Sequence, residues 1–462
     1  MKNKWITVIV LLAAFACPGN AAIKTKTITR TEDPVVMECS ISEAMKTVAA
    51  PIDQLSLMAY SGGAWAPVPF QVDQKKPDGS YAFPNGPEKS ADPKPNLDAN
   101  DELVFMAVDT GDQCGECFKP EGATAGIEIE LTDPKDGAKG WAYLFRFDGK
   151  APRSDKDYVS LEFDKGKDRT RIVTDRSVIE KLSDRSVPDF LAPKNPDGSL
   201  GPNLVDKFKI RESVDVPLLN QTYDLKLEER IIAHELAWID GAVRVLILDR
   251  FELAVTTFIT VEAPSTSVTS YYRNQSISPI TYSQPKVSGV TSAIMAVADK
   301  LTANDRMDVY MDFRPEIYGA HFFSAVHPER DDVVMDGKMS EAEKSLTQKP
   351  LTDWVAAESP FGTVVLRLVL PPQLARVKTT LFYMDDKDRA DPPENSPGVH
   401  AIGYSMHSFG DAFRSEDEVD KVKGMVIQSY TYYKDESGPG GVQELLDILD
   451  HPLAVTARPI PK

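Results

Sequence analysis

Four glycine-containing turns separate alternating apolar runs, and this pattern constrains the fold more than any other feature of the chain. The turns are Gly62-Gly63, Asp78-Gly79, Asp136-Gly137 and Asp240-Gly241. Glycine supplies the positive φ that a tight hairpin turn needs. The clearest example is RIIAHELAWIDGAVRVLILDRFEL, in which both flanking runs have the period of a strand. Frequent short strands joined by such turns predict a mostly β chain with two antiparallel β-sandwich-like domains and few helices.

Helical spacing and composition suggest how the chain is divided. A short helix is expected after Gly337, and GGVQELLDILDHP has the apolar spacing of a second one. The charged, Pro-rich stretch over 166–215 is expected to be an irregular connector. We therefore predict four parts: a signal peptide over 1–22, an N-terminal β-sandwich domain over 23–165, the connector over 166–215, and a C-terminal β-rich domain over 216–462.

The first residues, MKNKWITVIVLLAAFACPGNAA, have the pattern of a secretory signal peptide. Lys2 and Lys4 precede an apolar stretch too short to span a bilayer comfortably, and Gly19-Asn20-Ala21 is a small-x-small cleavage site. We expect export to the periplasm or cell surface, with no transmembrane segment after signal cleavage. The alternatives are a retained membrane anchor and lipidation at Cys17.

The charge balance restricts the partners. The chain has 52 Lys and Arg against 70 Asp and Glu, a formal charge of -18, and loss of Lys2 and Lys4 makes it -20. Such a surface repels phosphates, so no nucleic acid partner is expected. No P-loop or Rossmann fingerprint occurs, so no nucleotide is expected either.

Cys114 and Cys117 lie two residues apart in DTGDQCGECFKPEG. Covalent haem attachment is excluded because Phe118 stands where that motif has histidine. An acidic loop disfavours a low thiol pKa, and zinc bound by four cysteines needs a second such pair. In an oxidising compartment a disulfide is favoured, pairing Cys114 with Cys117, or Cys39 with either of them. A redox role and a metal role for the pair are the alternatives.

Two acidic loops are candidate calcium sites. DDVVMDGKMSEAE resembles an EF-hand loop, although Val334 stands where that family has an oxygen ligand. PNLDANDELVF alternates oxygen-bearing side chains before a strand. The candidate ligands are Asp332, Asp336, Ser340 and Glu343 in the first loop and Asp98 and Asn100 in the second. The alternatives are a turn that caps the following helix and ordinary Asx-turn chemistry.

Several side chains are candidates for binding or catalysis. Trp141 and Tyr143 lie on one face of WAYLFRF, where they can stack on sugar rings or belong to the core. His234 shares a predicted strand face with Arg230, a pair that can bind an acidic sugar and transfer protons, or can be structural. A further set is a candidate zinc site: His321, His327 and Glu329.

The stretches APVPFQVDQ and LDANDELVFMAVDTGD resemble the start of certain uncharacterised secreted bacterial β-sandwich proteins. The matching residues lie within 65–112: Pro69, Gln71, Asp73, Asp101, Glu102, Leu103, Val104 and Phe105. Some of those proteins are placed beside mutarotase-like, carbohydrate-acting supersandwiches, so the resemblance implies a role with sugars but names no catalytic residue.

These features lead to one functional expectation and two alternatives. The expectation is an exported acidic β-sandwich protein that serves as a binding or structural component of the envelope, with a glycan or an envelope protein as partner. The first alternative is a polysaccharide lyase or hydrolase that uses His234 and Arg230. The second is a redox accessory protein that uses Cys114 and Cys117.

Overall fold

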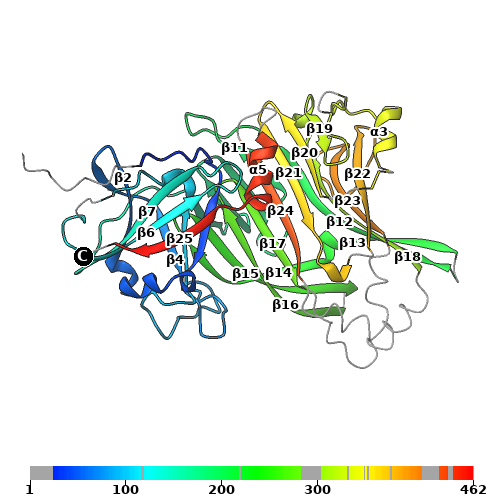
Figure 1. Cartoon of the computed structure of the whole chain (residues 1–462). Coiled ribbons are helices and arrows are strands. Elements are labelled where there is room, and N and C mark those ends of the chain that lie inside the picture. Colours follow the sequence, from blue (N-terminus) through cyan, green and yellow to red (C-terminus); the bar gives the residue numbers. More distant parts are fainter. Residues whose placement is uncertain are drawn as a thin grey trace, which may run out of the picture.

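The computed structural model describes residues 24–115, 119–217, 220–256, 259–281, 303–329, 332–347, 349–350, 353–374, 377–407, 426–434 and 441–460. The predicted signal peptide, with Cys17, and also Cys117 lie outside the described residues. Every strand pair in the described ranges is antiparallel, and the chain is mostly β (Figure 1). The predicted fold class is therefore confirmed.

The N-terminal unit is a sandwich of two sheets, with strand orders β1-β5-β4 and β25-β6-β7-β2-β3. Its strands are β1 (Pro34–Glu38), β2 (Leu55–Ser61), β3 (Ala64–Pro67), β4 (Phe70–Asp73), β5 (Glu102–Met106), β6 (Ala123–Thr132), β7 (Lys139–Phe147) and β25 (Ala454–Pro459). Side chains such as Leu57, Leu103 and Ile129 fill the space between the sheets. Strand β25, from the end of the chain, pairs with β6, so the C-terminal segment belongs to this unit.

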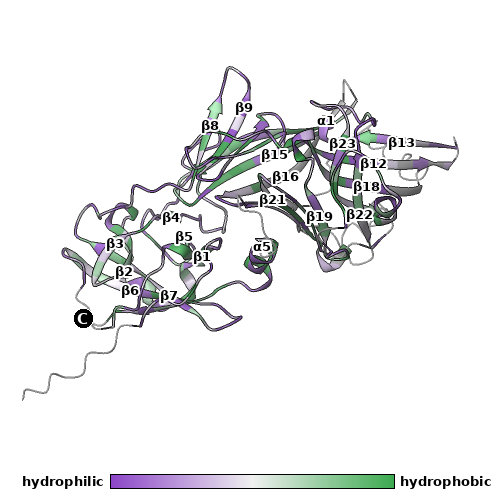
Figure 2. Cartoon of the chain, turned by 90° about the horizontal axis from the view of Figure 1, so that it is seen from above, coloured by the Kyte–Doolittle hydropathy of each residue, from purple (hydrophilic) through white to green (hydrophobic). Residues whose placement is uncertain are grey.

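The C-terminal unit contains a five-stranded sheet, β13-β12-β18-β23-β22, and an eight-stranded sheet, β14-β15-β16-β17-β24-β21-β20-β19. The first comprises β12 (Val205–Val216), β13 (Gln221–Lys226), β18 (Ala303–Phe313), β22 (Lys378–Asp386) and β23 (Val399–His407). The second comprises β14 (Ile231–Asp240), β15 (Arg244–Thr256), β16 (Ile259–Tyr272), β17 (Gln275–Thr281), β19 (His321–Ser324), β20 (Trp354–Ser359), β21 (Gly362–Val369) and β24 (Val426–Lys434). Figure 2 shows the two units side by side.

The predicted hairpins are present where the turns lie between paired strands. β2 pairs with β3 around Gly62-Gly63, β6 with β7 around Asp136-Gly137, and β14 with β15 around Asp240-Gly241. Gly62, Gly63 and Gly137 have φ values of 59°, 87° and 76°, which few other residues adopt. Gly241 is needed for space instead, because a Cβ there would lie 2.3 Å from Gln71 Oε1.

The prediction of an irregular connector over 166–215 is wrong. This segment contains β9 (Arg169–Thr174), β10 (Ser177–Leu182), β11 (Phe190–Pro193) and most of β12, and the first three form a sheet with β8 (Val159–Asp164). In β9 the charged side chains that suggested a connector are half-buried and alternate with buried residues. In β9, Arg171 binds Glu180 of β10, while Ile172 is buried against the eight-stranded sheet.

Helices are few in the described part, as predicted. They are α1 (Leu227–Arg230), α3 (Glu341–Leu346) and α5 (Gly441–Asp450), and the last two lie where helical spacing was expected. The apolar face of α5 contributes Leu445 and Leu446 to one buried cluster with side chains of β21 and β24. None of the described helices has the length and apolar character needed to cross a membrane.

The two units meet at a buried ion-pair network. Arg244 of β15 donates from Nε to Asp73 Oδ2 at 2.7 Å and also pairs with Glu102. Gln71 Oε1 accepts hydrogen bonds from the backbone N–H groups of Val243 and Arg244, at 2.9 and 2.8 Å. Three residues of the motif at 65–112 therefore hold β4 and β5 against the eight-stranded sheet.

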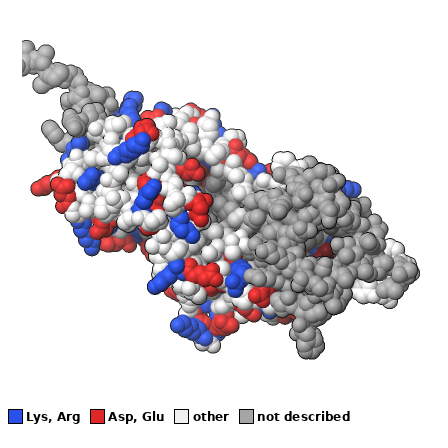
Figure 3. Space-filling model, turned by 90° about the horizontal axis from the view of Figure 1, so that it is seen from below, with Lys and Arg blue, Asp and Glu red and all other residues white. Residues whose placement is uncertain are grey.

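Basic and acidic side chains are interspersed on the described part of the face in Figure 3, with no patch of a single sign.

Candidate functional site

The sandwich of the C-terminal unit is filled at one end. Phe322 of β19 and Leu366 of β21 pack against Tyr383 of β22 and Ile402 of β23, and the Phe322 and Tyr383 ring centroids are 4.7 Å apart. Large side chains from both sheets interdigitate here, as in an ordinary sandwich core.

The other end of the sandwich contains a cavity of about 400 Å³. Its wall is mostly apolar and includes Phe208, Ile210, Val309 and Met311 of the five-stranded sheet, with Phe251 and Leu368 of the eight-stranded sheet. Every lining residue is buried or half-buried. A volume of this size lies within the range of small-molecule binding sites.

The cavity exists because one wall has small side chains. β16, β17 and β24 present Thr269, Ser276, Ser278, Ser429 and Thr431 to it. Ser276 is opposite Thr431 and Ser278 is opposite Ser429 in the ladder, so the hydroxyls form adjacent rows across the sheet. On the reverse face of β24, Tyr430 and Tyr432 are buried with α5. Small residues on one face and large ones on the other leave the unfilled volume on the inner side.

Two buried amides lie at the β16–β17 turn, where the cavity approaches the N-terminal unit. Asn274 is 2% exposed and Gln275 is 5% exposed, and both line the cavity. Asn274 Nδ2 donates to the backbone oxygen and Oε2 of Glu32, at 2.9 and 3.1 Å. Asn274 Oδ1 and Gln275 Oε1 have no hydrogen-bond partner among the described residues.

The charges near these amides are already paired. Arg273, the one charged side chain among the described lining residues, donates to Asp175 at 3.2 and 2.7 Å. Glu32 is 1% exposed and pairs with Arg176 at 2.9 Å. This end of the cavity is therefore polar and has balanced charges.

The predicted catalytic pair lies outside this cavity. Arg230 is in α1 and not on a strand, so the predicted shared strand face is wrong; its Nη1 donates to the backbone oxygen of Ala254 at 3.3 Å. The residues after it form β14, where His234 lies 3.2 Å from Glu252 of β15. Neither Arg230 nor His234 lines the cavity.

Trp141 and Tyr143 are core residues, which was the alternative to sugar stacking. They are 2% and 1% exposed and belong to one cluster with Phe145 and Phe147. Trp141 Nε1 donates to Glu130 at 3.0 Å, and Tyr143 OH donates to Glu128 at 3.2 Å.

The first predicted calcium loop divides into two structural parts. Ser340 and Glu343 form a capping box at the start of α3, which confirms the helix-capping alternative for these two residues. Glu343 also accepts a hydrogen bond from Tyr383 OH at 2.9 Å. Asp336 Oδ1 accepts a hydrogen bond from the backbone N–H of Lys338 at 2.9 Å.

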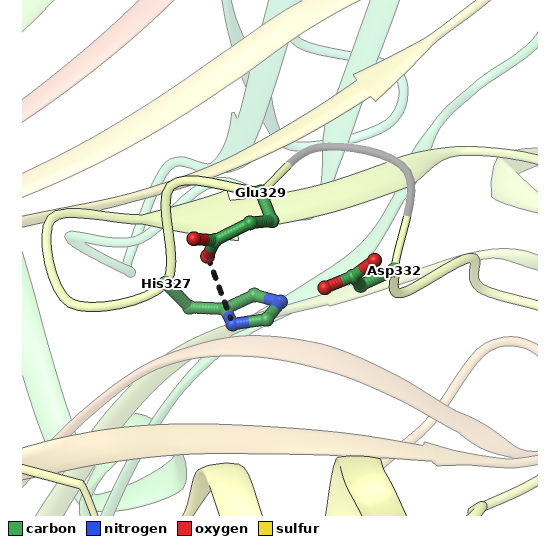
Figure 4. Close-up of side chains that lie close together, drawn as sticks. All are labelled: His327, Glu329 and Asp332. Atoms are coloured by element: carbon green, nitrogen blue, oxygen red, sulfur yellow. Dashed lines mark ion pairs between the residues drawn. The ribbon is translucent and has the colours of Figure 1, made fainter.

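Asp332 lies instead beside two members of the predicted zinc set. His327, Glu329 and Asp332 can each direct one ligand atom to within 4.8 Å of the others, and His327 Nδ1 lies 3.7 Å from Glu329 (Figure 4). His321 is not part of this group; its strand β19 pairs with β20. Glu329 and Asp332 are exposed. Calcium binding by Asp332 and zinc binding by His327 and Glu329 stay predictions.

The second predicted calcium loop forms hydrogen bonds within itself and to an earlier turn of the chain. Asp98 Oδ1 accepts from the backbone N–H of Asn100 at 3.1 Å. The Asn100 amide donates to the backbone oxygens of Lys75 and Lys76, at 2.7 and 3.0 Å. These bonds are those of an Asx turn, which was the alternative interpretation of this loop. Calcium binding there stays a prediction.

The cysteines differ in state. Cys39 is a buried free thiol, so the predicted pairing of Cys39 is wrong. Cys114 is buried and disulfide-bonded. Because Cys117 lies outside the described residues, the pairing of Cys114 with Cys117 stays a prediction.

The cavity residues were not among the predicted site residues, although the sequence contains a signal for them. QSIS at 275–278 and QSYT at 428–431 alternate hydroxyl residues with larger ones, and STSVTS at 265–270 is rich in hydroxyl residues. Such a pattern normally indicates a strand with one solvent-exposed face. The topology turns that face inward, toward the five-stranded sheet.

No protein-family model matches the chain, and no curated protein matches it either.

Proposed function

We propose that this protein binds an elongated apolar ligand between the two large sheets of its C-terminal unit, as a binding component of the cell envelope. The observation that supports the proposal is the cavity of about 400 Å³ with its mostly apolar wall. Protein interiors are normally packed as densely as organic crystals, so an unfilled volume of this size in a sandwich core is a binding feature.

The volume and the wall set the expected affinity. A water occupies about 30 Å³ in the liquid and a methylene group is similar in size, so the cavity holds roughly a dozen such groups. Burial of a methylene contributes about 0.8 kcal/mol, giving about 10 kcal/mol in total. Association costs at least about 4 kcal/mol in lost motion. The remainder corresponds to a dissociation constant of the order of tens of micromolar.

Three methionines suit the wall to flexible ligands. Met307 and Met311 of β18 and Met406 of β23 all line the cavity. Methionine is unbranched and polarisable, so it adapts to ligands of different shape. The site therefore favours a class of apolar chains over one rigid molecule.

The location of the protein is proposed from its sequence. The leader at 1–22 supports export, and an apolar ligand for an exported binding protein is a lipid of the envelope. N-terminal sequencing of the purified protein is expected to find a start near Ala22. A chain that keeps Met1 and stays in the cytoplasm would contradict this part of the proposal.

The polysaccharide-enzyme and glycan-binding alternatives have less support. His234 and Arg230 do not line the cavity, and Trp141 and Tyr143 are buried in the N-terminal unit. A glycan array with the purified protein tests both alternatives. Specific glycan binding that survives blockage of the cavity would favour them over the present proposal.

The test uses N-phenyl-1-naphthylamine, whose fluorescence rises in apolar sites. We expect saturable binding that is weakened at least tenfold by Val309→Trp, which fills the cavity from β18. The matched control is Val36→Trp on β1, where valine is 39% exposed. If the Val309→Trp variant does not fold, a smaller substitution replaces it. Thr431→Leu is then the cavity variant, and Thr222→Leu on the exposed β13 is its control. Equal probe binding by the cavity variants and their controls would overturn the proposal.

A further inference from the structure

We infer that the ligand is a single-chain lipid with oxygen atoms spaced along one side of its hydrocarbon chain, and that hydroxyl groups of β17 and β24 bind these oxygen atoms. The inference rests on the proposed function and adds the chemical class of the ligand.

Four hydroxyl side chains of β17 and β24 are open to the cavity. They are Ser276, Ser278, Ser429 and Thr431. All four line the cavity and are half-buried, so part of their surface is accessible. Ile277 and Tyr430, which alternate with them along the strands, pack in the cluster with α5 on the reverse face of the sheet. A ligand in the cavity therefore reaches the four hydroxyls.

These hydroxyls need partners from outside the chain. Within the described residues, none of the four side chains forms a hydrogen bond. A hydroxyl rotates about its C–O bond, so it donates or accepts as its partner requires. Either water or a ligand oxygen can therefore satisfy each of them.

A plain hydrocarbon chain is a poor match for this wall. It would displace water from the hydroxyls and offer no hydrogen bond in return, and each such loss weakens binding by about fivefold or more. Four losses of this size multiply to roughly 600-fold, which would cancel most of the affinity that methylene burial supplies. The ligand therefore carries its own oxygen atoms where it faces β17 and β24.

The strand ladder sets the spacing of these oxygen atoms. Ser276 is opposite Thr431 in a first row, and Ser278 is opposite Ser429 in a second row. Residues two apart on a strand are separated by about 7 Å, which about five carbon–carbon bonds of an extended chain span. The facing wall on the five-stranded sheet is apolar, so the other side of the chain is hydrocarbon.

The experiment compares three competitors of N-phenyl-1-naphthylamine: dodecane-1,6-diol, dodecane-1,2-diol and dodecan-1-ol. The two diols have the same formula and differ in the separation of their hydroxyl groups. We expect dodecane-1,6-diol to bind at least fivefold more tightly than either of the others, because it alone reaches both rows.

Ser429→Ala removes one hydroxyl from the second row and changes the cavity volume little. It is expected to weaken binding of dodecane-1,6-diol about three- to tenfold, the effect of one hydrogen bond, and to leave probe binding within twofold. Ser278→Ala, in the same row, should have the same effect. The matched control is Ser270→Ala on β16, because Thr269 and Tyr271 line the cavity and the residue between them lies on the reverse face.

The outcomes separate this inference from the proposed function. If the three competitors bind equally and neither serine substitution has an effect, the assignment of the hydroxyl rows is wrong while the cavity remains the binding site. Tighter binding of dodecane-1,2-diol would place the oxygen atoms at one end of the chain and would also overturn the inference. If neither the probe nor any competitor binds, both proposals fail together.

Discussion

Arg244 Nε lies 2.7 Å from Asp73 Oδ2, and this contact joins the N-terminal unit to the eight-stranded sheet. Both side chains are almost fully buried, at 3% and 1% exposure. Burial raises the pKa of Asp73, and Arg244 beside it lowers that pKa. The pair therefore depends on both partners, because either charge alone would be buried without compensation.

Arg244→Ala is expected to destabilise the protein by about 3–5 kcal/mol, because it leaves Asp73 buried without a cation and Glu102 with Lys75 as its one remaining cation among the described residues. Urea unfolding at pH 7 measures the loss. The control is Arg458→Ala, since Arg458 pairs with Glu128 but is 65% exposed, and such surface pairs contribute about 1 kcal/mol or less. Similar effects of the two substitutions would contradict the role given to Arg244.

Asp249→Asn is expected to stabilise the protein at alkaline pH. Burial raises the pKa of Asp249 to about 6, Lys181 lowers it and Glu235 raises it. A carboxyl with a raised native pKa stabilises the protein most below its unfolded value of about 4, and the contribution is lost as the pH rises through 6. Asparagine stays neutral, so the variant should exceed the parent at pH 8 by about 2–3 kcal/mol.

The difference between this variant and the parent should shrink toward pH 4. Chemical unfolding at several pH values measures it. Asp155→Asn, at an exposed position, is the control and should leave the pH dependence unchanged. A variant at position 249 that is less stable at pH 8 than the parent would show that the ionised carboxylate is needed there.

Ser340→Ala is expected to destabilise the protein by about 1 kcal/mol, with or without calcium, because it removes the cap of α3. Ser340→Asp keeps an oxygen acceptor and should retain most of the stability. Thermal melts with calcium and with a chelator measure both variants. A loss that occurs only in the presence of calcium would indicate that Ser340 is a metal ligand, as the EF-hand resemblance suggested.

Cys39 is expected to resist iodoacetamide in the native protein at pH 8. Burial raises the pKa of its thiol to about 12, and the charge of Asp101 adds to the effect, so little thiolate forms. Unfolding without reductant should expose one reactive thiol per mature chain if Cys114 is paired with Cys117. Mass spectrometry counts the alkylated sites. Three thiols under those conditions would exclude the disulfide.

Local sequence patterns determined the elements that depend on neighbours in the chain. Glycine turns and period-two alternation located the hairpins at 136–137 and 240–241, because turn geometry and strand periodicity are local properties. The helix at Gly441–Asp450 followed from its apolar spacing in the same way. The strands at 169–182 were missed since their alternating residues are charged, and only the sheet shows that these charges pair across strands.

The sequence by itself determined that this protein is a β-rich, acidic chain, and that its hairpins close at particular glycines. Tertiary structure decided what its motifs do. Gln71, Asp73 and Glu102 were visible as a motif, but their shared partner, Arg244, is 142 residues or more away along the chain. The cavity also depends on contacts between distant segments. An alternating Ser/Thr face predicts solvent exposure, but the long-range pairing of its strands places that face toward another sheet. Contacts between distant segments are set by packing of the whole chain, and no local pattern encodes them.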